Sequence, residues 1–503
     1  MNAAATPPVS AYAELERRFA RRSAILDAAG MLEWDYAAMM PEGGAGARGR
    51  QLVALQRVAH DMLTDPAVGD LLDAAEGDAG LDGWQADNLR RMRRIHAGET
   101  AVPADLVEAF TQACKDCEMV WRKARPASDF AALLPALQRV LDLVRQVAAA
   151  KAERFGCAPY DALLDDYDPG ATTARIDAVF EPYAAALPDL LDDALRRQAA
   201  RPQPVRPEGP FPVESQRALG HALMRAVGFD FDHGRLDVSL HPFCGGVPDD
   251  VRITTRYDEA DFASGLMGVL HETGHAMYER GLPADWRGQP VGHSCSMALH
   301  ESQSLLVEMQ ACRSPAFLRF AAGRIRAAFG ERPGLDADNL ARLYTRVKPD
   351  FIRVDADEIT YPAHVILRYR LEKALMAGAL PLADVPGEWN RGLQALIGVT
   401  PPDDRRGCLQ DIHWPDGLFG YFPTYTLGAM AAAQLFDAAV RADPAIPDAI
   451  GRGDFAPLMA WLRTHVHGHG SRYATDTILQ RATGRPLDPS VFMAHLRRRY
   501  LDG

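Results

Sequence analysis

Residues 271–275, which read HETGH, combine residue types and a spacing that can hold a metal ion and activate water. The surrounding residues have helical spacing, with Asp258 expected as the N-cap and Gly281 as the stop. Because residues four apart lie on one side of a helix, His271 and His275 can face one ion. Glu272 is rotated by about 100° and can take a proton from water there. The pattern predicts a zinc site with Glu272 as its general base.

A catalytic zinc ion needs a third protein ligand, and the strongest candidate is Glu301. This residue follows His275 by 26 positions, on a second stretch with helical spacing. The loop between the two stretches is rich in proline and glycine, so the helices could pack antiparallel and bring the carboxylate to the ion. Glu279, His300 and His293 are competing ligands and would indicate a different kind of zinc site. Spacing alone leaves this choice open.

Further polar and aromatic groups that could bind a substrate follow later in the chain. Arg353 and Asp357 are four residues apart, and Pro362 indicates a kink or a fresh helix start. The alternative reading of this stretch is an ordinary charged helix. A second stretch, residues 410–428, is dense in glycine and aromatic residues, with His413 and Tyr421 among them. It suits either a pocket wall or a turn in the core.

The elements that must position these residues are mostly helices. Residues 12–200 and the stretch from 258 to the end have helical spacing, which predicts a mostly α protein. Short alternating stretches near 236–240 and 251–254 predict two strands joined by a loop at 244–248. The proline-rich stretch 201–210 is the best linker candidate. We therefore expect an N-terminal region 1–205 and a catalytic region 206–503 with its strands at about 236–256, integrated into one structural unit.

Composition excludes several classes of function. The chain has 503 residues and a net charge of −12, which argues against nucleic acid as a partner because phosphate binding needs a basic surface. No apolar run reaches the roughly 18 residues that a membrane span needs, and no signal peptide is evident. Seven scattered cysteines are typical of reduced thiols, so we expect a cytoplasmic protein that acts away from membranes.

The motifs together resemble the thermostable carboxypeptidase Taq family of metallocarboxypeptidases along nearly the whole chain. The matching stretches are HPF at 241–243, DVRIT at 250–254, HETGH at 271–275, HESQ at 300–303, IRVDAD at 352–357 and GCLQDIHW at 407–414. The resemblance implies that His271, His275 and Glu301 bind zinc and that Glu272 is the base. It also implies one metal ion per chain, with cobalt as a substitute in some members.

The same resemblance implies roles for residues that bind the substrate. Arg353 would grip the C-terminal carboxylate, and Tyr425 would bind the substrate or the transition state. His413, His241 and Arg252 would line the cleft, and Tyr421 lies in the same aromatic stretch as Tyr425. The implied fold is a large, mostly helical, two-lobed body with a deep groove, similar to neurolysin. The implied assembly is a homodimer.

The main hypothesis is a zinc carboxypeptidase of broad specificity, acting on peptides with a free C-terminus. Arginine suits this function because its planar fork can hold a carboxylate with two hydrogen bonds. The first alternative is a zinc endopeptidase or oligopeptidase on the same scaffold. The second is a peptide-binding protein without catalysis, against which the intact Glu272 argues.

Overall fold

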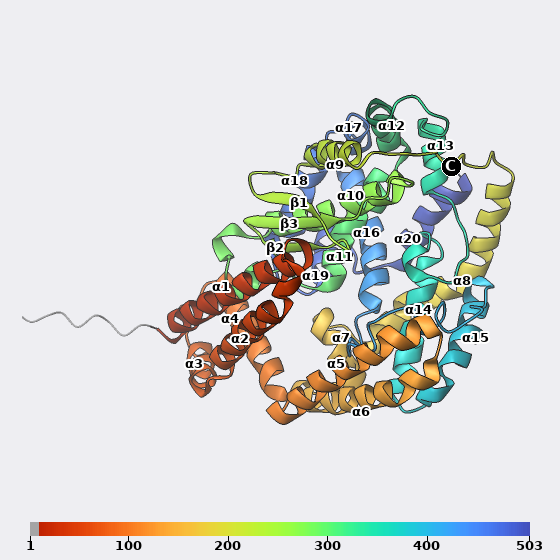
Figure 1. The fold of residues 1–503 in the computed structure, drawn as a ribbon. Coiled ribbons are helices and arrows are strands. Elements are labelled where there is room, and N and C mark those ends of the chain that lie inside the picture. Colours follow the sequence, from red (N-terminus) through yellow and green to blue (C-terminus); the bar gives the residue numbers. More distant parts are fainter. Residues whose placement is uncertain (1–9, 503) are drawn as a thin grey trace, which may run out of the picture.

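The computed structural model describes residues 10–502, which form a mostly helical body around one small sheet (Figure 1). The predicted fold class is thereby confirmed. The helices before the sheet are α1 (Ala11–Ala38), α2 (Ala45–Thr64), α3 (Pro66–Glu76), α4 (Gly83–Ala101), α5 (Ala104–Ala127), α6 (Phe130–Phe155), α7 (Pro159–Tyr167), α8 (Thr173–Ala199) and α9 (Val213–Val227). Those after the sheet are α10 (Phe262–Gly281), α11 (Met297–Leu305), α12 (Pro315–Phe329), α13 (Ala337–Tyr344), α14 (Tyr361–Met376), α15 (Val385–Ile397), α16 (Pro423–Ala442), α17 (Ile446–Ile450), α18 (Ala456–His465), α19 (Thr475–Thr483) and α20 (Pro489–Arg497).

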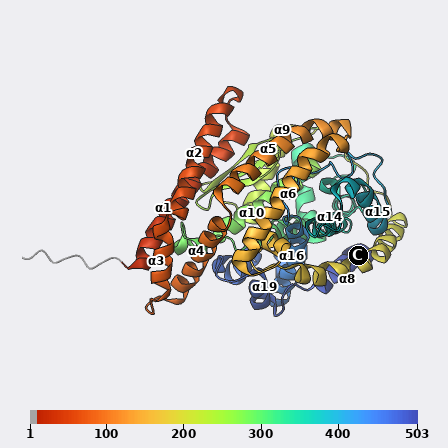
Figure 2. The same cartoon turned by 90° about the horizontal axis from the view of Figure 1, so that it is seen from below.

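The apolar side chains form two cores of very different size. The larger core extends from α5 to the C-terminal helices and contains most buried apolar residues. The smaller one joins α1, α2, α3 and α4, which lie together at one side of the molecule (Figures 1 and 2). Residues 201–212 between α8 and α9 form neither helix nor strand. The division of the chain near residue 205 stays a prediction.

The sheet contains three strands, β1 (Gly234–Val238), β2 (Cys244–Val247) and β3 (Asp250–Thr255). β3 is central, with β1 parallel on one side and β2 antiparallel on the other. The loop expected at 244–248 is wrong, because residues 244–247 pair with β3. Glycine gives little strand signal in a sequence, yet Gly246 is needed here. It has φ 84°, and an added Cβ would meet the Asp250 carbonyl oxygen at 2.2 Å.

Helix α10 follows the sheet and carries the HETGH residues. It ends at Gly281 as expected, but the N-cap is Asp261 and the prediction of Asp258 is wrong. The Asp261 carboxylate accepts from the backbone N–H groups of Ala263 and Ser264, whereas Asp258 accepts from Ala260 in the preceding turn. Asp261 therefore satisfies the first-turn donors. No helix among residues 10–502 is long and apolar enough to cross a membrane.

Candidate metal centre

Helix α11 is held between α10 and α16, and two glycines permit this close approach (Figure 1). At Gly274 of α10, an added Cβ would lie 2.5 Å from the carbonyl oxygen of Gln303. At Gly428 of α16, it would lie 2.8 Å from the Cβ of Glu301. Real Cβ atoms do not approach other atoms so closely, so larger residues would push α11 away from its neighbours. The two glycines thus fix where the Glu301 side chain begins.

The side chains of His271, His275 and Glu301 converge on one point. One ligand atom from each lies within 4.8 Å of the other two, and no other such group occurs among residues 10–502. The His271 Nε2 atom is 3.9 Å from Glu301 Oε1, and the His275 Nε2 atom is 3.6 Å from Glu301 Oε2. Ligands about 2.1 Å from a tetrahedral ion stand about 3.4 Å apart. The donor set and its spacing therefore fit a single divalent ion.

A second carboxylate fixes the orientation of the His271 ring. Glu308 Oε2 lies 2.9 Å from His271 Nδ1, which leaves Nε2 directed towards Glu301. The other Glu308 oxygen pairs with Arg313. Glu308 belongs to a π-helix, η4 (Leu306–Cys312), that continues α11. A carboxylate behind a histidine ligand fixes its tautomer and makes the imidazole a better donor.

The competing ligands have other partners. Glu279 Oε1 lies 2.7 Å from His300 Nε2, so these two side chains pair with each other. The His300 ring stacks on the His275 ring with centroids 4.5 Å apart. His293 belongs to no metal-ligand group in the described part of the chain. Geometry therefore favours Glu301 where spacing alone left the ligand open.

The electrostatics of this centre favour a cation. Burial lowers the pKa of His271, but the Glu308 hydrogen bond and nearby carboxylates prevail and raise it to about 10. Burial and the Glu301 charge raise the pKa of Glu272 to about 7, against a lowering by His271. A carboxyl group with a pKa near neutrality is well matched to accept and return protons. The centre combines negatively charged carboxylates around the histidines with a carboxyl group suited to proton transfer.

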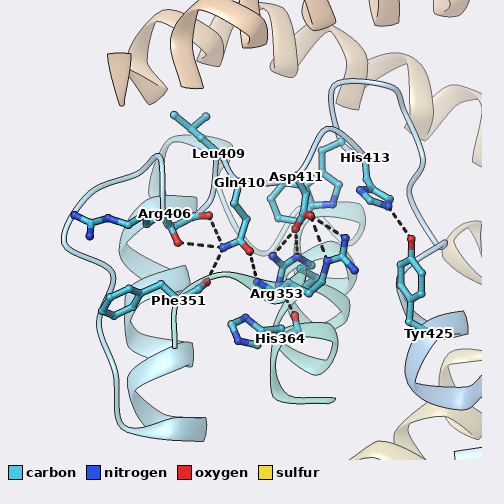
Figure 3. Close-up of polar contacts among 12 residues, drawn as sticks. Phe351, Arg353, His364, Arg406, Leu409, Gln410, Asp411, His413 and Tyr425 are labelled. Atoms are coloured by element: carbon cyan, nitrogen blue, oxygen red, sulfur yellow. Dashed lines mark hydrogen bonds and ion pairs between the residues drawn. The ribbon is translucent and has the colours of Figure 1, made fainter. Parts of the chain in front are cut away.

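Arg353 belongs to a buried cluster built around one carboxylate (Figure 3). Its Nε and NH2 groups donate to Asp411 Oδ1 at 3.2 and 3.0 Å, and NH1 donates to the Tyr361 hydroxyl at 2.9 Å. The other oxygen of Asp411 accepts from Arg368 Nε at 2.8 Å. Burial raises the pKa of Asp411, but Arg368 and Arg353 outweigh it and hold that pKa well below its usual range. Asp411 stays charged and positions both arginines.

Aromatic side chains cover the same cluster. The Arg353 guanidinium lies 4.9 Å from the Tyr425 ring centroid, and His413 Nε2 is 3.3 Å from the Tyr425 hydroxyl (Figure 3). The Tyr421 and Tyr425 rings meet edge to face at 5.3 Å. Burial lowers the pKa of His413 to about 4, so this ring is neutral near pH 7. The structure thus brings together four of the six predicted substrate-binding residues, which are Arg353, His413, Tyr421 and Tyr425. The other two, His241 and Arg252, are not part of this cluster.

His241 and Arg252 lie near the sheet instead. Arg252, on β3, stacks over Trp34 at 4.3 Å and pairs with Asp250. His241 is exposed in the segment between β1 and β2. Within residues 10–502, no hydrogen bond or ion pair joins either residue to the metal cluster or to Arg353. Trp34 was not predicted as a partner, since 218 positions of sequence separate it from Arg252.

Comparison with known families decides which chemistry this geometry serves. The profile described as carboxypeptidase Taq (M32) metallopeptidase matches residues 14–500. This chain belongs to that family. The M32 assignment confirms the resemblance seen in the motifs and makes the chain a metallopeptidase that depends on a divalent metal ion.

Relatives of the M32 family support the same conclusion. Thermostable carboxypeptidase 1 of Thermus thermophilus is 38% identical over 98% of this chain and 99% of its own length. Carboxypeptidase 1 of Bacillus subtilis is 33% identical over 94% and 95% of the two chains. The solved structure of Trypanosoma cruzi metallocarboxypeptidase 1 superposes with a TM-score of 0.96 at 42% identity, covering 98% and 99%. The chain is a metal-dependent carboxypeptidase and hence a peptide hydrolase.

Proposed function

We propose that this M32 carboxypeptidase uses one zinc ion per chain, held by His271, His275 and Glu301, with Glu272 as its general base. The observation that carries the proposal is the convergence of those three ligand atoms within 4.8 Å of one another. The two histidines lie on α10, which also bears Glu272, and Glu301 lies on α11. Imidazole and carboxylate donors suit zinc, with one coordination position left for water or substrate. Cobalt, which accepts the same ligands, is a proposed substitute.

The reaction divides between the metal and the side chains around it. A zinc ion held by these residues would make bound water more acidic and would polarise a carbonyl group. The Glu272 carboxylate takes the proton from the attacking water and returns it to the leaving amine. The Tyr425 hydroxyl, which contacts His413, supplies a hydrogen-bond donor towards the transition state. Tyr421 packs against Tyr425 and limits the motion of its ring.

Arg353 is proposed to bind the C-terminal carboxylate of the substrate. Its guanidinium has five N–H donors, of which Asp411 and Tyr361 occupy three, so two remain for a ligand. The charge of Arg353 also acts on Glu301, so the arginine and the metal centre are electrostatic neighbours. A fixed cation near the scissile bond selects a terminal carboxylate over a chain that continues.

The experiment that tests this function compares a peptide with a free C-terminus with the same peptide amidated at its C-terminus. Mass spectrometry of the zinc-loaded protein should show single residues released stepwise from the free acid. The amide should be cleaved far more slowly, because it has no charge for Arg353. Equal cleavage of both peptides, or internal cuts, would favour the endopeptidase alternative. The contributions of His241 and Arg252, the cytoplasmic location and the homodimer stay predictions.

A further inference from the structure

A buried carboxylate, Glu358, binds side chains that come from the C-terminal part of the described chain. Its Oε2 atom accepts from Arg499 NH1 at 2.8 Å and from the Tyr500 hydroxyl at 3.1 Å, and His495 Nε2 lies 2.9 Å from its Oε1 atom. Glu358 itself is 4% exposed. Its partners lie on α20 and on the π-helix η8 (Arg498–Asp502), and α20 packs beside α16 and α8 (Figure 1). Residues 495–500 are therefore anchored on one negative charge.

The same carboxylate also holds the segment that bears Glu308. Glu358 Oε1 accepts from Gln310 Nε2 at 3.1 Å, and Arg499 NH2 donates to the Gln310 carbonyl oxygen at 3.5 Å. Gln310 lies on the π-helix η4, two residues after Glu308. Glu308 is the carboxylate behind the ring of His271. A path of contacts therefore runs from Arg499 to a proposed metal ligand.

The Arg313 side chain interacts with two carboxylates, Glu308 and Glu358. It pairs directly with Glu308 Oε1, and its NH1 group donates to the Tyr344 carbonyl oxygen at 3.4 Å. Burial raises the pKa of Glu358, but neighbouring cations, with Arg499 the strongest, outweigh burial and hold that pKa well below its usual range. Arg313 is one of those cations. Its charge therefore acts on both carboxylates, whereas its hydrogen bond goes to Glu308.

Arg499 controls how the charge of Arg313 is shared. A buried carboxylate needs a partner of opposite charge, and leaving one unpaired is strongly destabilising. With Arg499 present, Glu358 has a guanidinium partner of its own. Without it, the charge of Glu358 would draw Arg313 away from Glu308. Glu308 would then hold the His271 ring less firmly, and losing such support behind a metal ligand typically costs about 10- to 100-fold in metal affinity.

We propose that Arg499 is a positioning residue of the metal centre. By pairing with Glu358, it leaves Arg313 to hold Glu308. The Glu308 carboxylate in turn fixes the His271 ring for the metal. Within residues 10–502, no hydrogen bond or ion pair joins Arg499 to any of the three proposed ligands, so its effect passes through the buried charges. This role rests on the proposed function, in which His271 is a zinc ligand.

The test measures zinc affinity of the full-length protein by chelator competition. Arg499→Gln should bind zinc about tenfold or more weakly than wild type, whereas Arg499→Lys, which keeps the charge, should lose much less. Arg498→Gln is the matched control, because the adjacent Arg498 side chain is 58% exposed and lies 3.8 Å from Asp437, so this variant should bind zinc normally. The visible spectrum of the cobalt-loaded protein reports the geometry of the ligands, and it should change in Arg499→Gln but not in Arg498→Gln.

A double variant separates competition between charges from a general loss of packing. Arg499→Gln combined with Glu358→Gln removes both charges, so residue 358 no longer competes for Arg313, and zinc affinity should recover to within about threefold of wild type. The double variant has no unpaired carboxylate at position 358, so it decides the question even if Arg499→Gln fails to fold. Unchanged affinity in Arg499→Gln, equal weakening in Arg498→Gln, or no recovery in the double variant would overturn the proposal. The proposed ligand set fails separately, if wild type binds no zinc or if Glu301→Gln binds it as tightly as wild type.

Discussion

Replacing Arg353 by lysine should separate the proposed recognition of the C-terminal carboxylate from the rest of catalysis. Lysine keeps the positive charge but loses the planar fork. In the structure three of the five N–H donors of Arg353 serve Asp411 and Tyr361, which leaves two for the substrate. A lysine in the same place offers at most one well-directed hydrogen bond to the carboxylate, so one charge-assisted bond is lost.

The expected magnitude follows from that single bond. A hydrogen bond to a charged group contributes about 1.5–3 kcal/mol, so kcat/KM for a free-acid peptide should fall about 10- to 150-fold. Asp411 keeps Arg368 as a partner, which limits damage to the fold. Any remaining structural effect acts on all substrates alike. The informative quantity is therefore the ratio of kcat/KM for the free acid to that for its amide.

The assay measures both rates for wild type, Arg353→Lys and a control, Arg370→Lys. Arg370 forms an exposed pair with Glu181 on another helix, so its replacement should leave the ratio unchanged. The ratio should fall by the stated factor in Arg353→Lys. An equal fall in both rates, with the ratio unaltered, would refute the reasoning and reduce Arg353 to a structural role.

Three further variants test other parts of the account. Glu272→Gln should keep its zinc but lose about 10²–10⁴-fold in kcat, and full activity would remove Glu272 from proton transfer. Gly428→Ala should weaken zinc binding measured by chelator competition, because the new Cβ meets Glu301 at 2.8 Å, whereas Gly323→Ala, with open space around it, should not. Asp411→Asn should destabilise the protein by about 3–5 kcal/mol at pH 7 by leaving two arginines unpaired. Because native pairing holds the pKa of Asp411 low, its stabilisation is complete above the unfolded-state pKa of about 3.9 and is lost as pH falls below it. Denaturant titrations should therefore show the difference from wild type shrinking below pH 4, and a constant difference would contradict the charge argument.

The sequence was informative where chemistry depends on local helix geometry. The four-residue spacing of the two histidines placed both imidazoles on one face of α10, as the structure confirms. Proline at 362 predicted a fresh helix start, and α14 begins at Tyr361. Glu301 could be proposed as a third ligand but not chosen, because the choice depends on how closely α11 packs between two other helices.

The sequence failed where partners are distant or the helix is irregular. Arg353 and Asp357 suggested a pair on one helix, but Arg353 lies in a 3₁₀ turn, η5 (Arg353–Asp355), and Asp357 accepts from Ile359 and Thr360 instead. The real partner, Asp411, is 58 residues away. Glu308 lies on a π-helix, whose wider turn shifts side chains from the positions that regular spacing predicts. Neither the pair of Arg353 with Asp411 nor the pair of Glu308 with His271 carries a local sequence signal.

The measurement that tests the central claim most directly is zinc content per chain after dialysis against a weak chelator. Wild type should retain about one equivalent, whereas Glu301→Gln and His275→Gln should lose it, because each removes one of three ligands. Glu279→Gln should retain zinc, since Glu279 pairs with His300 and not with the cluster. Undiminished zinc in Glu301→Gln, or loss confined to Glu279→Gln, would contradict the proposed ligand set.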